Sequence, residues 1–178
     1  MSCVLTAAIA AQCRDAVGGI SKVWAVEVAA AHEGDATYVE TSGALTTLTL
    51  ETTPTARTIY AWNFGKDSAS INEIVHTGNE NGTTMYDHGL ELSFWKWETN
   101  KRNEILIAAT TPLLIVVKDQ NSQYWALGLT RGLDMQDGAE ATSGKLLNDK
   151  NGYTLQFMGS EPAPVIEITD AVFIEALP

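Results

Sequence analysis

Most of the chain alternates apolar and polar residues with a period of two, and glycine-rich or polar turns interrupt this alternation at short intervals. A period of two is typical of a β-strand with one buried and one exposed face, because successive side chains point to opposite sides. We therefore predict about nine strands, over residues 22–29, 45–50, 58–64, 69–77, 83–98, 113–117, 123–129, 153–157 and 165–174.

Two neighbouring segments do not alternate. Residues 100–111 follow the good N-capping residues Thr99 and Asn100, carry an apolar run and end before Pro112, which predicts a helix. Residues 113–117 are continuously apolar, which predicts a strand covered on both faces. The helix is expected to lie on the flank of the β-structure.

The segment 83–98 is long for a strand, and it follows residues 78–82, whose Asn-Gly step is the strongest short signal for a hairpin. Asp87 and Glu91 fall on the polar face of this segment, so we expect them to be exposed carboxylates. A strand of this length suits a hairpin that reaches beyond its own domain and pairs with a neighbouring molecule.

Tryptophans gather near the end of the same segment. Trp95 and Trp97 fall on what had been its polar face, so either a bulge reverses the register or that face becomes covered there. Aromatic residues at strand spacing more often form a core or a subunit interface than a ligand platform. We interpret Trp95, Trp97 and Trp62 as candidate assembly-interface residues, with Trp95 and Trp97 buried in the contact.

These elements predict a mainly β fold, a single-domain β-barrel or sandwich with one flanking α-helix at about residues 100–111. No repeat or linker divides the chain, so residues 1–178 are expected to form one domain. Residues 1–17 are interpreted as an N-terminal arm, and residues 130–148 as a glycine-rich acidic loop with little periodicity. Both are expected to become ordered on contact with a neighbouring subunit.

The charge balance narrows the function. Asp and Glu total 22 against 11 Lys and Arg, which gives a formal net charge of −11 over 178 residues. This balance argues against a protein that binds nucleic-acid phosphates, because such binding needs clustered basic residues. It suits a surface that a polyanion passes without adhering.

No apolar run is long enough to span a bilayer, and no basic residue precedes the apolar stretch 4–11, so neither a membrane segment nor an export signal is expected.

The sequence carries no motif for catalysis, cofactor binding or metal binding. G-x-S-x-G, P-loop, G-x-G-x-x-G and H-E-x-x-H patterns are all missing. The three histidines form no ligand pair, and the adjacent Asp87 and His88 point to opposite faces of a strand. Cys3 and Cys13 are too few for a disulfide framework and are interpreted as free thiols, with a local bridge between them as the alternative. We therefore expect no enzyme, no catalytic residue, no cofactor and no metal.

The order of turns and strands carries a further signal. It comprises residues 13–23 upstream and, in the downstream half, 119–128, 132–134, 143–144, 149–157 and 159–162. This arrangement resembles virion structural proteins of tailed bacteriophages, and most closely tail tube (major tail) proteins. The resemblance covers residues 13 to about 162 and depends on turn chemistry and strand order rather than on reactive residues.

The resemblance implies a β-barrel or sandwich with a flanking helix, six copies of which join their sheets into a homohexameric ring. Stacked rings then form the tail tube, with DNA as passing cargo and with tape-measure and terminator proteins as further partners. It implies no catalytic residue. Asp87 and Glu91 become candidates for an acidic lumen, and the expected location is the virion tail, after synthesis in the cytoplasm of the bacterial host.

Two alternatives stay open. One is a capsid decoration or head-fibre protein, whose β-domain binds to a lattice of the virion. The other is a small carbohydrate-binding β module, in which exposed aromatic rings stack on sugars. The candidate residues for such a platform are Tyr60, Trp62, Phe64, Trp95 and Trp97.

Overall fold

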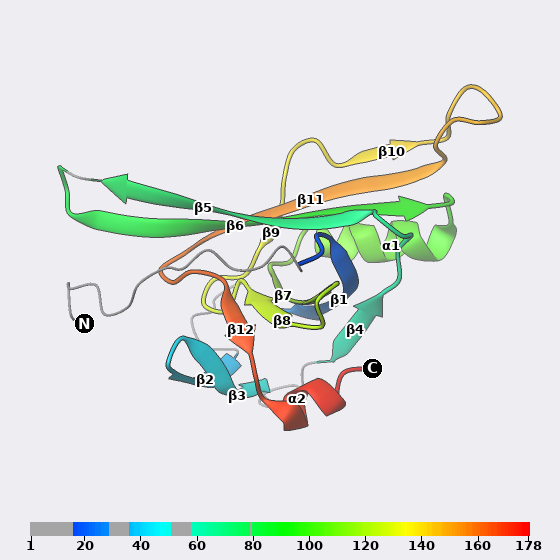
Figure 1. Cartoon of the computed structure of the whole chain (residues 1–178). Coiled ribbons are helices and arrows are strands. Elements are labelled where there is room, and N and C mark those ends of the chain that lie inside the picture. The colour runs from blue at the N-terminus through cyan, green and yellow to red at the C-terminus, as the bar shows by residue number, and fades with distance from the viewer. Residues whose placement is uncertain (1–15, 29–35, 51–57, 79) are drawn as a thin grey trace.

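A computed structural model describes residues 16–28, 36–50, 58–78 and 80–178 (Figure 1). Within these ranges the chain is mainly β, as predicted, and its strands form two sheets. Sheet A contains β1 (Ile20–Glu27), β2 (Ala36–Thr41), β3 (Ala44–Leu50), β4 (Ile59–Trp62), β7 (Leu113–Asp119), β8 (Tyr124–Leu127) and β12 (Ile166–Ile168). Sheet B contains β5 (Ala69–Gly78), β6 (Thr83–Trp95), β9 (Asp134–Met135), β10 (Glu140–Thr142) and β11 (Gly152–Glu161). The helices are α1 (Thr99–Ala108) and α2 (Ala171–Glu175).

The two sheets are open and stack on one another. Sheet A has the order β2-β3-β12-β8-β7-β1-β4, and sheet B has the order β10-β11-β6-β5, with β9 also paired to β11. Neither order closes on itself in the described part of the chain, so the barrel alternative is wrong and a sandwich describes the fold. Figure 1 shows sheet B lying across β1, β7 and β8, with α1 beside them.

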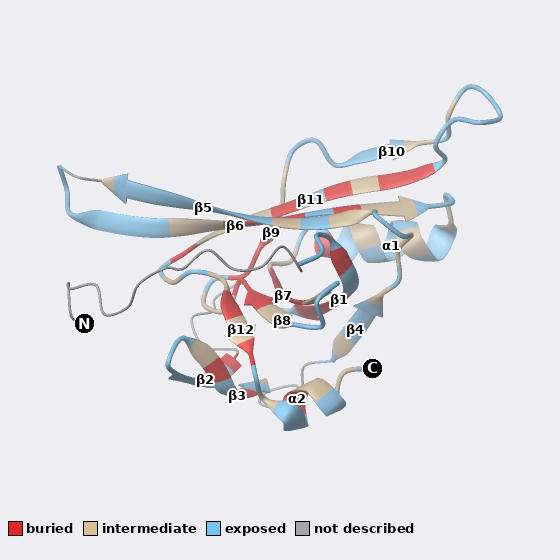
Figure 2. Cartoon of the chain, in the orientation of Figure 1, coloured by how far each residue is buried: buried red, intermediate tan, exposed pale blue. Residues whose placement is uncertain are grey.

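An apolar core joins the two sheets. Val23 of β1 and Ile115 of β7 pack in one cluster with Leu92 of β6 and with Leu155 and Phe157 of β11. All five side chains are at most 2% exposed. Figure 2 shows the corresponding buried segments in the middle of both sheets.

A second core covers the other face of sheet A. Trp24 of β1 and Leu114 and Val116 of β7 pack there with Leu45 of β3 and Phe173 of α2. Because β7 contributes alternate residues to both cores, residues 113–117 are buried without a break. The prediction of a strand covered on both faces is confirmed.

The predicted flanking helix exists, with different ends. α1 spans Thr99–Ala108, and its N-cap is Glu98 in an extended conformation (φ −133°), which makes no side-chain capping bond. The predicted caps Thr99 and Asn100 are therefore wrong, because the backbone is already helical at both positions. The helix gives way to a turn after Ala108, before Pro112 is reached.

The predicted last strand, residues 165–174, is divided. Only β12 is strand, and α2 follows it. Asp170 starts this helix, since its Oδ1 accepts hydrogen bonds from the backbone nitrogens of Val172 (3.1 Å) and Phe173 (3.2 Å). Apolar residues at 166, 168, 172 and 174 fit a strand period, but the Asx cap makes the second half helical.

Residues 130–148 are more ordered than the predicted loop. They contain β9 and β10, both of which pair with β11. Of the predicted arm 1–17, residues 1–15 lie outside the described residues, as do Cys3 and Cys13. The backbone of Val17 exchanges two hydrogen bonds of 2.9 Å with the side chain of Asn121.

Strand β6 runs to Trp95 without a bulge, because its registers with β5 and β11 are unbroken. Trp95 therefore stays on the polar face, opposite Gly152. Lys96 then adopts φ +67°, which ends the strand, and the ring of Trp97 lies 6.1 Å from that of the inward-facing Tyr153. The bulge alternative is wrong, and the two tryptophans do not share a face.

Candidate functional site

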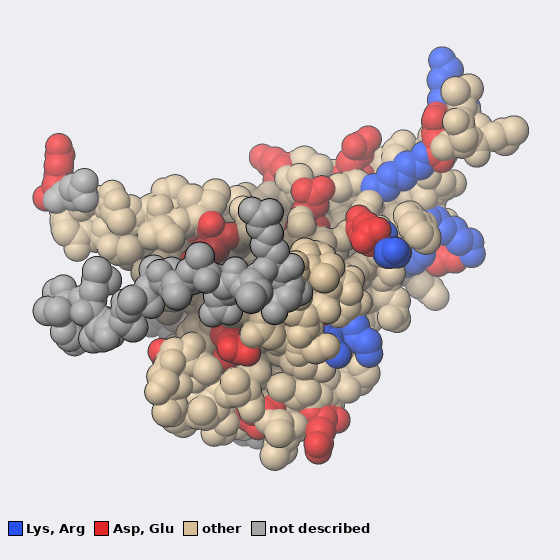
Figure 3. Space-filling view, in the orientation of Figure 1, with Lys and Arg blue, Asp and Glu red and all other residues tan. Residues whose placement is uncertain are grey.

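The face of sheet B that points away from sheet A is polar, and no described element covers it. Alternate residues of paired strands build this outer face: Ser70, Asn72, Ile74 and His76 of β5, Asp87, Glu91, Ser93 and Trp95 of β6, Thr154, Gln156, Met158 and Ser160 of β11, and Asp134 and Glu140 of β9 and β10. Figure 3 shows acidic side chains gathered along the middle of this sheet. The outer face therefore combines small polar residues with carboxylates.

Asp87 is fixed in the centre of the outer face by both neighbouring strands. Ser160 Oγ on β11 donates to Asp87 Oδ1 (2.6 Å), and His76 Nε2 on β5 donates to Oδ2 (2.7 Å). The bond from Ser160, followed by the bond from His76 and its charge, holds the pKa of Asp87 below its ordinary value against the opposing effect of burial. Glu91 is exposed as predicted, whereas the Asp87 side chain is only 15% exposed.

This trio of side chains is not arranged for nucleophilic catalysis. The Ser160 hydroxyl bonds to the carboxylate of Asp87, and the His76 imidazole bonds to the other oxygen of the same carboxylate. A serine nucleophile needs a base that accepts its proton, which is the role of histidine in a triad. The geometry instead orients one carboxylate on the surface of the sheet.

Positive charge is nearly absent from the strands that carry this face. Residues 68–95, which include β5 and β6, contain four carboxylates and no lysine or arginine. Lys150 reaches the face at one end, where its Nζ donates to Ser93 Oγ (2.5 Å) and to Thr154. Other basic residues collect near α1 and the loop before β11 (Figure 3), namely Lys96, Lys101, Arg102 and Lys145.

Sheet B ends in two open edges, β5 and β10, to which no further strand pairs within the described ranges. Three antiparallel pairings separate the edges, so β5 and β10 run in opposite directions. The β5–β6 hairpin also projects beyond the sandwich (Figure 1). The projecting part of this hairpin exposes Ile74 (44%), Val75 (52%) and Met85 (43%). A long, partly apolar free edge is a template for pairing with another chain.

The aromatic candidates are distributed over different surfaces. Trp62 packs inside against Phe94 and Phe157, at ring-centroid distances of 6.1 and 5.6 Å. Trp95 is 61% exposed on the outer face, and Trp97 is 49% exposed beyond the strand end. Burial of Trp95 and Trp97 in an assembly contact stays a prediction, and the five aromatics proposed for sugar stacking do not form one platform.

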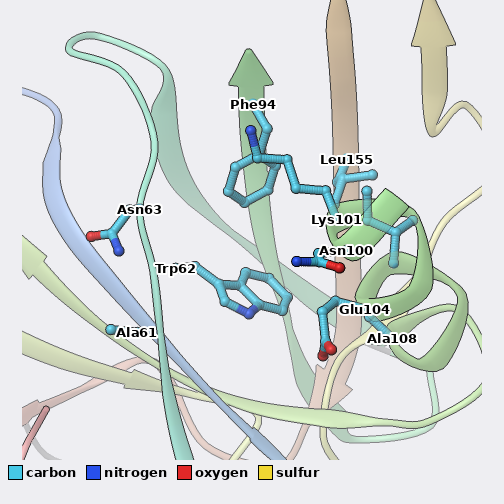
Figure 4. Close-up of a pocket in the computed structure, with 10 residues that line it drawn as sticks. Ala61, Trp62, Asn63, Phe94, Asn100, Lys101, Glu104, Ala108 and Leu155 are labelled. Atoms are coloured by element: carbon cyan, nitrogen blue, oxygen red, sulfur yellow. The ribbon is translucent and has the colours of Figure 1, made fainter. Parts of the chain in front are cut away.

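An apolar pocket of about 270 Å³ opens between β4 and α1 (Figure 4). Its walls are formed by Trp62 and Ala61 of β4, Phe94 of β6, Leu155 of β11 and, from α1, Asn100, Lys101, Glu104 and Ala108. Figure 4 shows the Trp62 indole extending across the space towards α1. Polar groups line only part of the pocket.

Sequence reasoning missed a buried polar pair, His88 and Glu161, each 3% exposed. His88 Nε2 donates to the Ala163 carbonyl (3.1 Å), and its Nδ1 accepts from the Gly128 nitrogen (3.4 Å). Burial holds the pKa of His88 below its ordinary value, although nearby carboxylates oppose this shift. Glu161 accepts hydrogen bonds from the backbone nitrogens of Thr130 and Arg131. These hydrogen bonds anchor the loop after β8 to the end of sheet B.

Comparison with known protein families, curated proteins and solved structures finds no match to this chain. Among the described residues, no group of three or more His, Cys, Asp or Glu side chains is placed to hold a metal ion. Neither described helix has the length and apolar character that crossing a membrane requires.

Proposed function

We propose that this chain is a virion structural protein of a tailed bacteriophage that assembles into stacked rings forming the tail tube. The observation that carries the proposal is the open face of sheet B, which is acidic and is bordered by two free strand edges. Neighbouring copies pair through these edges, and the acidic face lines the bore through which DNA passes.

The strand directions favour ring formation. Because β5 and β10 run in opposite directions, the β10 edge of one copy meets the β5 edge of an identically oriented copy as an antiparallel pair. Every copy then repeats the same contact, which is a heterologous arrangement that closes into a ring when the rotation allows. The family resemblance implies six copies.

The charge distribution favours a conduit. Asp87 and Glu91 lie on β6, in the middle of sheet B, and the segment 68–95 contains no lysine or arginine that could bind a phosphate backbone. Like charge keeps a polyanion from adhering to a wall. The bonds from Ser160 and His76 fix the Asp87 carboxylate in place. Tape-measure and terminator proteins are the expected further partners, and the virion tail is the expected location.

Light scattering after size-exclusion chromatography, followed by negative-stain microscopy, tests the proposal. We expect rings, and tubes at high concentration. A particle that stays monomeric at the highest attainable concentration would overturn the proposal. Discrete trimers that bind empty capsids would replace it with the capsid-decoration alternative.

A pair of proline substitutions tests edge pairing itself. Adjacent residues of an edge strand direct their N–H groups alternately to the partner strand and to the open side. Proline has no backbone N–H. Of Ile74→Pro and Val75→Pro, one therefore removes a backbone hydrogen bond between β5 and β6, and the other removes only an N–H that points to the open side of β5. We expect the variant with unchanged thermal stability to lose ring assembly, because its open edge can no longer pair. Normal rings from that variant would contradict pairing through β5.

A further inference from the structure

The loop between β10 and β11 presents two leucines to water, although the loop itself is firmly built. Asp149 Oδ2 accepts hydrogen bonds from the backbone nitrogens of Lys145 (2.8 Å) and Leu146 (2.7 Å). Leu146 is nevertheless 66% exposed and Leu147 fully exposed (109%). Ordered loops that keep apolar side chains exposed to solvent are typical of protein–protein interfaces. We call residues 144–149 the leucine loop.

The pocket between β4 and α1 has the complementary character. It is about 270 Å³ in volume, its walls are mostly apolar, and Leu146 and Leu147 do not line it. Exposed apolar residues continue beside it, with Tyr60 at 53% and Ile107 at 44%. The exposed carboxylates of Glu27 and Glu104 flank this surface.

The topology places the loop and the pocket at the same end of sheet B but on opposite edges. The loop leaves β10 at Thr142, which pairs with Gly152, and Gly152 pairs with Trp95 at the end of β6. The β5 edge begins at Ala69 at this same end, next to the turn that connects it to β4. When the β10 edge of one copy meets the β5 edge of the next, the loop therefore arrives beside the β4–α1 pocket.

We propose that the leucine loop of one copy docks into the β4–α1 pocket of the neighbouring copy around the ring. Leu146 and Leu147 fill the apolar pocket, and Lys145 faces the carboxylates of Glu27 and Glu104. This inference rests on the proposed function and adds to it the side-chain contact that fixes the register of neighbouring edges. The occupant is a second copy, because charge and edge position match it.

Substitution of the loop tests the contact. Leu147→Glu places a charge on a side chain that makes no contact within its own chain, so folding is expected to be unchanged. Burial of a leucine is lost at every ring contact, and we expect the concentration for half-assembly to rise at least about tenfold. Val172→Glu is the matched control, since Val172 is 79% exposed on α2, and it should leave assembly unchanged.

Crosslinking tests the location. In a chain carrying Cys3→Ser and Cys13→Ser, one preparation receives Leu147→Cys and another Ala61→Cys, at an exposed residue of the pocket wall. A short bismaleimide should join the two preparations into dimers when they are mixed and assembled, and Val172→Cys in place of Leu147→Cys should not react with the Ala61→Cys chain. Rings without this crosslink, or rings unaffected by Leu147→Glu, overturn the docking contact while leaving the tube proposal intact. Absence of rings from the unmodified chain overturns both.

Discussion

Sheets A and B differ in how many of their faces are buried. In sheet A, Leu114 and Ile115 of β7 face opposite ways, and both are buried, at 1% and 0% exposure. In sheet B, Leu92 of β6 is buried, whereas its neighbour Glu91 is exposed. The central strand β7 of sheet A is therefore enclosed on both faces by its own chain, whereas β6 of sheet B keeps one face free.

This difference indicates which residues stabilise the fold and which are free to interact with other molecules. An enclosed sheet gains free energy from apolar burial on both faces, and substitutions there are costly. A free polar face contributes little to folding, so its acidic character needs another explanation, which the tube proposal supplies. The projecting β5–β6 hairpin belongs to the same free part of the molecule (Figure 2).

The largest expected effect comes from substitutions in β7, the strand of sheet A that is buried on both faces. Ile115→Ala and Leu114→Ala should each lower the free energy of unfolding by about 2–5 kcal/mol, because each leaves a cavity in one of the two cores. Gln156→Ala, on the outer face of β11, should change it by less than about 0.5 kcal/mol. Urea titrations followed by tryptophan fluorescence measure all three. Similar values for the three variants would remove the distinction between the sheets.

A smaller effect should appear when the outer face is made basic. The double variant Glu91→Lys and Glu140→Lys should let assembled protein bind double-stranded DNA at least about tenfold more tightly, a difference of about 1.4 kcal/mol. The matched control is Glu167→Lys with Glu175→Lys, which changes the net charge equally on sheet A and α2. Fluorescence anisotropy of labelled DNA at fixed salt compares them. Equal affinities for the two variants would show that net charge alone matters and would count against an acidic bore.

The sequence predicted the elements whose pattern is local. The alternation over residues 83–98 identified β6, and the Asn-Gly step identified its hairpin with β5. The continuous apolar run identified β7 and its two covered faces. Glu91 could be placed on an exposed face for the same reason, since a regular strand fixes the side of each residue.

The features that the sequence did not predict depend on contacts between residues that are far apart along the chain. Residues 134–135 and 140–142 lack a strand pattern and become β9 and β10 only because β11 offers them a partner. The strand period placed His88 on the face opposite Asp87, but its burial depends on Gly128 and Ala163, which lie far along the chain and hydrogen-bond to its ring. The β4–α1 pocket likewise needs residues from four elements to be brought together, which no single segment signals.

A still smaller effect is expected at the start of α2, which covers the outer core of sheet A. Asp170 caps this helix and also accepts the Leu48 backbone nitrogen of β3 (2.9 Å). Asp170→Ala should lower the free energy of unfolding by about 1 kcal/mol, since it leaves these donors without their acceptor. Asp170→Asn keeps an acceptor and should lose less. Urea titration measures both, and an equal loss in both variants would mean that the charge, rather than the cap, matters.

The pH dependence of stability sharpens the comparison at His88, where the inner side of sheet B meets the loop after β8. Burial keeps the folded-state pKa of this histidine below its unfolded value of 6.5, so the unfolded chain binds a proton first as the pH falls. Stability should therefore decrease as the pH falls from about 7 through this window, and His88→Gln, which has no titrating imidazole, should lose that slope.

Three carboxylates titrate in a separate, more acidic window. Asp87, Asp149 and Asp170 have lowered pKa values, and the stability that these carboxylates contribute is lost only as the pH falls below about 4, in the original chain and in His88→Gln alike. Thermal unfolding measured from pH 7.5 to 3.5 separates the two windows. An identical slope between pH 7 and 5 in both chains would mean that the imidazole takes up its proton as readily in the folded chain as in the unfolded one, because the neighbouring carboxylates of Glu73 and Glu161 offset its burial.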